Sequence, residues 1–139
     1  MGVRHKGRQI ALQVLYQWDV AGVPLAEALA TYREHLNPSP EAFEFARELV
    51  EGVKEKKDEL DALISRYSRN WRLERMLATD RNILRLATYE LLFRPDIPPK
   101  VSLNEAVELA KEFGSEDSPA FVNGILDAIY RHEVRPRET

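Results

Sequence analysis

Apolar side chains recur at every third or fourth position along most of this chain, the spacing that places them on one face of an α-helix. Residues 8–20 show the pattern clearly, with Ala11, Val14, Leu15 and Trp18 on one stripe. Alternating apolar and polar residues, which are typical of strands, are not found over a comparable length. The periodicity predicts helices over residues 8–20, 25–36, 40–67, 80–94, 102–113 and 118–129, and a short apolar element over residues 71–77. The longest of these segments is one helix or two collinear helices.

Residues that start and stop helices separate these segments. Gly22 ends the first, and Ser39 followed by Pro40 supplies an N-cap and a first helical residue for the third. Ser102 and Glu105 have the spacing of a capping box, in which each side chain bonds the other residue's backbone amide. The sequence therefore predicts an all-α fold, a compact bundle of about seven helices.

The composition agrees with a folded chain of amphipathic helices. The 139 residues are 44% hydrophobic and 31% charged, which suits one domain over residues 1–139 with a buried core. There is no cysteine, which excludes disulfides, thiolate metal sites and cysteine nucleophiles. No apolar run approaches the roughly 20 residues that span a bilayer, and the N-terminal segment lacks the apolar stretch of a secretory signal. We therefore expect a cytoplasmic protein without membrane contact.

Positive charge is concentrated near the N-terminus. The net charge of −3 is less basic than is usual for a nucleic-acid-binding domain. However, Arg4, Lys6 and Arg8 all precede the first acidic residue. We interpret residues 1–7 as a flexible basic arm that can follow phosphates, and residues 131–139 as a loose C-terminal tail.

Residue types that carry catalysis are not grouped in this sequence. His5, His35 and His132 are scattered without the spacing of metal ligands. A glycine-rich phosphate loop and a nucleophile elbow are both missing, and no acidic helix face has a Glu-x-x-His partner. The sequence predicts a protein that binds and is not an enzyme, with no metal and no cofactor.

Two aromatic residues lie away from the centres of the predicted buried faces. Tyr16 is at the edge of the first stripe, and Phe121 is about 100° from Val122 around the last helix. Exposed rings stack on unpaired bases with roughly 1–3 kcal/mol each. Packing at the edge of the core is the alternative, and periodicity alone favours it.

Several short motifs follow one another in a specific order. They are Arg8, Ala11, Leu15 and Tyr16, then Ile83-Leu84-Arg85, Tyr89-Glu90-Leu91, Asp96-Ile97-Pro98, residues 104–111 and residues 121–127. Together they resemble the bacterial transcription antitermination factor NusB family, and the resemblance covers residues 8–130.

The resemblance implies seven or so helices in two small subdomains, with no catalysis. It implies binding of the boxA element of nascent ribosomal RNA, as a single strand, together with ribosomal protein NusE in the transcribing RNA polymerase complex. The RNA-binding positions that it implies are Arg4, Lys6, Arg8, Tyr16, Asp117 and Phe121. The NusE face that it implies contains Asp80, Arg81 and Glu90, although Glu90 is also explained as a structural residue.

Two other interpretations stay open at this stage. The chain is alternatively a helical protein-binding scaffold, whose basic arm is only a solvated tail. It is alternatively the detached RNA-binding domain of a ribosomal RNA methyltransferase, although no Rossmann-like strand or glycine-rich loop follows the helices. A homodimer is a further candidate assembly. Base preference stays open too, because stacking and phosphate contacts carry little sequence information.

Overall fold

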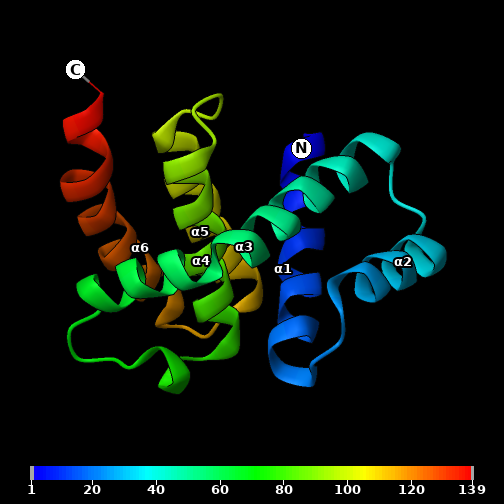
Figure 1. Ribbon diagram of the computed structural model, residues 1–139, viewed down its shortest axis with the longest axis horizontal. Coiled ribbons are helices and arrows are strands. Elements are labelled where there is room, and N and C mark those ends of the chain that lie inside the picture. The colour runs from blue at the N-terminus through cyan, green and yellow to red at the C-terminus, as the bar shows by residue number, and fades with distance from the viewer. Residues whose placement is uncertain (1, 139) are drawn as a thin grey trace. The chain divides into compact units, whose positions relative to one another are not determined.

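The computed structural model describes residues 2–138 and contains six α-helices (Figure 1). They are α1 (Val3–Ala21), α2 (Leu25–Leu36), α3 (Pro40–Tyr67), α4 (Ala78–Phe93), α5 (Pro99–Phe113) and α6 (Ser118–Ile129). Three short helical turns are η1 (Leu73–Arg75), η2 (Tyr130–Val134) and η3 (Arg135–Arg137). No strand occurs within residues 2–138. The predicted all-α fold is confirmed.

The predicted helix count of about seven was too high by one, because residues 71–77 form only the 3₁₀ turn η1. The backbone is extended on both sides of this turn, at Arg72 and at Met76. Residues 40–67 form one continuous helix, α3. Ser39 caps it as predicted, since the Ser39 hydroxyl accepts a hydrogen bond from the Ala42 amide at 3.2 Å.

The chain divides into two compact units, residues 1–55 and 56–139, and α3 runs through the boundary between them. The first unit contains α1, α2 and the beginning of α3. Its buried side chains include the predicted stripe of α1, from Ile10 to Leu15, whereas Trp18 is half-buried. Gly22 ends α1 in the left-handed conformation with φ 70°, where a glycine carries no steric cost.

The predicted flexible arm is helical over residues 3–7, because α1 begins at Val3. Contacts with α3 explain this early start. Gly7 is buried, and a Cβ atom at this position would lie 2.7 Å from Cδ2 of Phe45. The guanidinium groups of Arg4 and Arg8 lie 5.1 and 5.4 Å from the centre of the same ring. Met1 lies outside the described residues.

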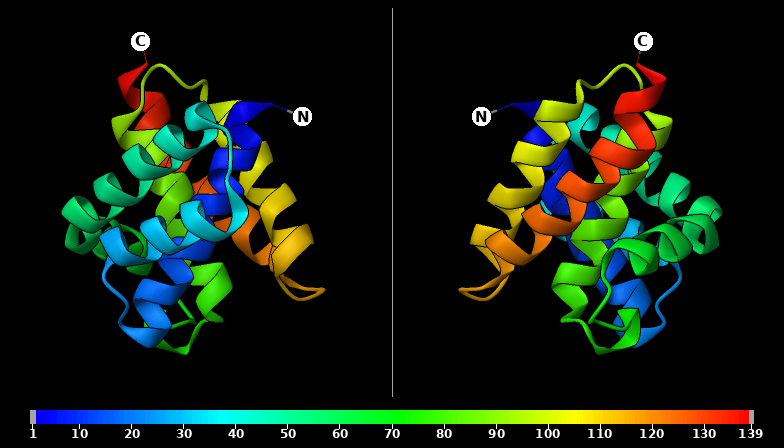
Figure 2. Two further views of the ribbon diagram at one scale, coloured as in Figure 1. Left: turned by 90° about the vertical axis from the view of Figure 1, so that its right-hand side faces the viewer. Right: turned by 90° about the vertical axis from the view of Figure 1, so that its left-hand side faces the viewer.

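In the second unit, α5 packs against both α4 and α6, and α4 also packs against α6 (Figure 2). The capping-box prediction was wrong, because α5 already begins at Pro99 and Ser102 lies inside it. Proline at the first helical position starts the helix without a side-chain cap. At the end of α5, Gly114 is extended rather than left-handed, and it allows Ser118 to approach closely.

The predicted loose tail continues as ordered turns up to Arg137. Val134 is buried, and the His132 ring stacks on Tyr67 with 5.8 Å between ring centres. The Tyr67 hydroxyl donates a hydrogen bond to Glu133 at 2.5 Å. These contacts with the end of α3 account for the order. Thr139 lies outside the described residues.

Candidate nucleic-acid interface

The basic residues of the first unit differ in accessibility. Arg4 and Lys6 are exposed on the first turns of α1, whereas Arg8 is buried with only 3% of its surface accessible. The N-cap of α1 is Gly2, which provides no side-chain cap, and the first turn contains no acidic residue. The backbone amides of the first turn and the positive end of the helix dipole therefore reinforce two exposed cations. This arrangement attracts anions such as phosphate.

Tyr16 lies farther along the same helix. Tyr16 is 43% exposed. It comes twelve residues after Arg4, which corresponds to about 18 Å along the helix axis. The first unit thus presents cations at one end of α1 and an accessible aromatic ring nearer its other end.

In the second unit, the two predicted RNA-side residues lie at the start of α6. Asp117 is exposed at the N-cap position, and its carbonyl oxygen accepts the Phe121 amide at 3.1 Å. A carboxylate at this position also interacts favourably with the helix dipole, which gives Asp117 a structural role as well. Phe121 is half-buried. Its ring contacts Trp71 edge-to-face, with 5.8 Å between ring centres and an interplanar angle of 80°.

Trp71 belongs to this surface, although the sequence pattern placed it only in a short apolar element. In the structure Trp71 is 54% exposed. It lines a shallow depression of about 480 Å³ together with Ser65, Ser68, Arg69, Asn70, Arg72, Leu73 and Glu74. The available signal was the run Arg69-Asn70-Trp71-Arg72, in which an aromatic residue is interleaved with cations.

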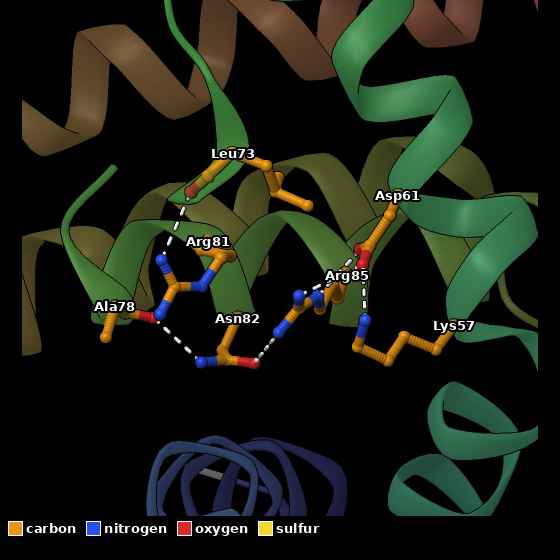
Figure 3. Close-up of polar contacts among 7 residues, drawn as sticks. All are labelled: Lys57, Asp61, Leu73, Ala78, Arg81, Asn82 and Arg85. Atoms are coloured by element: carbon orange, nitrogen blue, oxygen red, sulfur yellow. Dashed lines mark hydrogen bonds and ion pairs between the residues drawn. The ribbon is translucent and has the colours of Figure 1, made fainter. Parts of the chain in front are cut away.

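The residues predicted for a protein-partner face are mostly not accessible. Glu90 is 2% exposed and accepts a hydrogen bond from the Ser102 hydroxyl at 2.7 Å, which favours the structural explanation. Asp80 is 5% exposed. Arg81 is half-buried and donates to the Leu73 carbonyl at 3.1 Å, so it holds η1 against α4 (Figure 3).

The Asp80 carboxyl is in an unfavourable environment for a charge. Its Oδ1 atom is buried without a hydrogen-bond partner among the described residues. Burial raises the pKa of this carboxyl above its usual range, and the Ser118 hydroxyl opposes part of the effect. Asp80 is therefore a buried part of the first turn of α4 and not an accessible contact residue.

A buried ion pair joins α4 to the end of α3. Arg85 donates to both carboxylate oxygens of Asp61, at 2.8 and 3.0 Å, and to the side-chain oxygen of Asn82 at 3.0 Å (Figure 3). Lys57 bonds Asp61 at 2.9 Å from the more exposed side. Such a bidentate pair fixes the geometry of two helices, and it engages the Arg85 guanidinium internally.

Within residues 2–138 no group of three or more histidine, aspartate or glutamate side chains is placed to hold a metal ion. No helix in the same range is both long and apolar enough to cross a membrane.

The fold and these surfaces define a small all-α protein of two helical units, with cationic and aromatic side chains accessible in each. The NusB family model matches residues 5–131, and the chain belongs to the NusB family, as the motifs predicted. It is 56% identical to the transcription antitermination protein NusB of Myxococcus xanthus over 133 residues, which cover 93% of this chain and 95% of that protein.

Solved structures support the same assignment. Thermotoga maritima NusB is 41% identical, with a TM-score of 0.88, and the match covers 96% of this chain and 94% of that one. A chain in the crystal structure of antitermination factors NusB and NusE in complex with dsRNA is 32% identical, with a TM-score of 0.85. That match covers 93% of this chain and 96% of the other.

Proposed function

We propose that this protein is a transcription antitermination factor that binds the boxA element of nascent ribosomal RNA together with ribosomal protein NusE. The observation that carries the proposal is the match to antitermination protein NusB over nearly the full length of both chains. The related complex of NusB and NusE with dsRNA supports RNA and NusE as ligands. In this proposal the protein works in the cytoplasm by binding, as an adaptor to the transcribing RNA polymerase complex, and not by catalysis.

We assign the proposed RNA contacts to the predicted residues according to the accessibility of their side chains. Arg4 and Lys6, at the positive end of α1, contact phosphates. Tyr16 and Phe121 stack on bases. Asp117 accepts a hydrogen bond from a base amino group, because a carboxylate repels phosphate.

Arg8 has a different part in the proposal, because it is buried. It lies on the Phe45 ring together with Arg4, and so it positions the first turns of α1. In the proposed NusE face, Arg81 holds η1 in place through its hydrogen bond to the Leu73 carbonyl. Asp80 and Glu90 are buried, so they act on this face only through the packing beneath it.

The charge of the chain explains why a protein partner is useful. With a net charge of −3, the chain repels RNA except at its local cationic surfaces, and its affinity alone should be weak. A partner that contributes RNA contacts of its own makes the second contact effectively intramolecular, which raises the overall affinity.

The direct test is RNA binding by the whole protein, with and without NusE, at two salt concentrations. A single-stranded boxA RNA, a scrambled RNA of equal composition and the boxA sequence as a duplex are compared. We expect preference for single-stranded boxA, stronger with NusE and weaker at high salt. Absence of any sequence preference with NusE present would favour the protein-binding scaffold. Preference for the duplex would refute the stacking contacts.

The proposed Phe121 contact has a matched control within the same unit. Phe121→Ala should weaken RNA binding at least about fivefold and leave the helical circular-dichroism spectrum unchanged. Phe93 is also a half-buried phenylalanine, but it is the last residue of α4, at the opposite end of that helix from Asp80, whereas Phe121 belongs to α6. Phe93→Ala should therefore leave RNA affinity unchanged. A large drop in melting temperature for Phe121→Ala, with RNA affinity retained, would make Phe121 a core residue.

A further inference from the structure

Trp71 is the most exposed of the large aromatic side chains in the described residues, yet its backbone is fixed. The Trp71 amide donates to the Ser68 carbonyl at 2.8 Å, and the Ser68 hydroxyl donates to the Trp71 carbonyl at 3.2 Å. Ser68 itself is buried. The indole ring is thus held out from the surface by a closed turn, with the Phe121 ring against it at 80°. A ring that is ordered before binding loses little entropy when a ligand stacks on it.

Positive charge surrounds this ring. Residues 66–75 contain four arginines and one glutamate, a local net charge of +3 in a chain whose total is −3. Arg66 is paired with Glu133 at 3.2 Å. Within residues 2–138 no hydrogen bond or ion pair engages the guanidinium groups of the remaining three, Arg69, Arg72 and Arg75. Arg69 and Arg72 line the depression beside Trp71.

We propose that Trp71 and Phe121 form a stacking subsite for one unpaired RNA base, with Arg69 and Arg72 contacting the phosphates on either side of it. This inference rests on the proposed RNA-binding function and assigns it a contact that the family motifs do not include. An open aromatic face binds any base, and adjacent arginines neutralise the backbone, which is the combination found in single-strand binding sites. Charge complementarity favours a polyanion over an apolar protein segment as the occupant.

The first experiment uses fluorescence, because the chain has only two tryptophans. Trp18→Phe leaves Trp71 as the sole indole emitter. Titration of this variant with single-stranded boxA RNA should quench the emission by stacking. The same RNA carrying abasic sites keeps the phosphates but has no base to stack, so it should quench less at equal saturation.

The second experiment measures RNA affinity for paired variants. Trp71→Ala should weaken single-stranded RNA binding by about fivefold to 150-fold, the range measured for one stacked base. Trp71→Phe retains a ring and should fall between wild type and Trp71→Ala. Leu77 is the matched control, because it is 54% exposed, as Trp71 is, but carries no ring. Leu77→Ala should bind RNA as wild type does. Circular dichroism confirms the fold of each variant.

The outcomes separate this subsite from the proposed function. If the wild-type protein binds RNA, but Trp71→Ala binds equally well and Trp71 emission is not quenched, the subsite is refuted and RNA binding stands. If the wild-type protein with NusE binds no RNA, the proposed function itself fails. If Trp71→Ala weakens NusE binding in the absence of RNA and leaves RNA affinity unchanged, the occupant is protein and the inference is overturned.

Discussion

Substitution of Gly7 tests whether the close contact between α1 and α3 is important for the stability of the first unit. Helix propensity alone predicts that Gly7→Ala stabilises the protein by about 1 kcal/mol, because glycine is the poorer helix former. The structure predicts the opposite. A Cβ atom at position 7 would lie 2.7 Å from Cδ2 of Phe45 and 3.0 Å from the Ala42 carbonyl oxygen.

The magnitudes decide between these two effects. Inserting a methyl group into a packed contact costs about 1–3 kcal/mol. We expect the upper part of this range, because one of the two obstacles is the α3 backbone and the other is a ring that also contacts Arg4 and Arg8. After subtraction of the propensity gain, the free energy of unfolding should fall by about 1–2 kcal/mol, which lowers the melting temperature by roughly 3–8 °C.

The same substitution in α6 serves as the control. Gly124 is exposed, and apart from its chain neighbours and the backbone of its own helix no heavy atom of the described residues lies within 4 Å of a Cβ atom built there. Gly124→Ala should therefore raise the free energy of unfolding by about 1 kcal/mol. Both variants are measured by urea denaturation followed by circular dichroism. A Gly7→Ala variant at least as stable as wild type would refute the packing argument, whatever Gly124→Ala does.

Three further predictions follow from the charged groups. Asp61→Ala leaves the buried Arg85 charge without its main partner and should cost about 3–5 kcal/mol in urea denaturation, whereas a loss below about 1 kcal/mol would mean that the pair is not structurally important. Replacing Arg4 and Lys6 together by alanine should reduce the slope of log affinity for RNA against log salt by about 1.4, and an unchanged slope would place the phosphate contacts elsewhere. Because burial raises the folded-state pKa of Asp80, its carboxyl contributes most stability below the unfolded pKa of about 3.9 and loses that contribution as the pH rises through the folded pKa. Asp80→Asn should accordingly be more stable than wild type at pH 7, with a difference that shrinks towards pH 4, and a difference that grows on acidification would contradict the assignment.

The sequence predicted the helices well because their signals are local. The stripe of α1, the Ser39 cap and the stop at Gly22 each depend on residues within a few positions of one another. The capping box at Ser102 failed for the same reason. Its motif is local, but the Ser102 hydroxyl bonds Glu90 on another helix, and the sequence contains no signal for that pairing.

The candidate site was harder to predict, because accessibility depends on tertiary contacts. Arg8 is a cation in a basic segment and was therefore predicted to contact phosphate. It is buried instead, with its guanidinium group over the ring of Phe45, which lies far along the chain. Trp71 has a large apolar side chain of the kind that usually lies in the core, but it is exposed and its ring contacts that of Phe121. A buried arginine and an exposed tryptophan are both exceptions to the usual burial preferences of these residue types. Such exceptions are determined by the packing of helices that are distant in the sequence.

The continuity of α3 has a consequence for how the protein unfolds. Each unit contains only a part of this helix. If one unit unfolds, its part of α3 is left without packing partners. That part is close to the length of about 12–15 residues below which an isolated helix is marginally stable in water. The remaining unit would then carry a fraying helical end, so melting of either unit weakens the other through a shared backbone. The two units are therefore expected to behave as coupled cooperative elements rather than as independent ones.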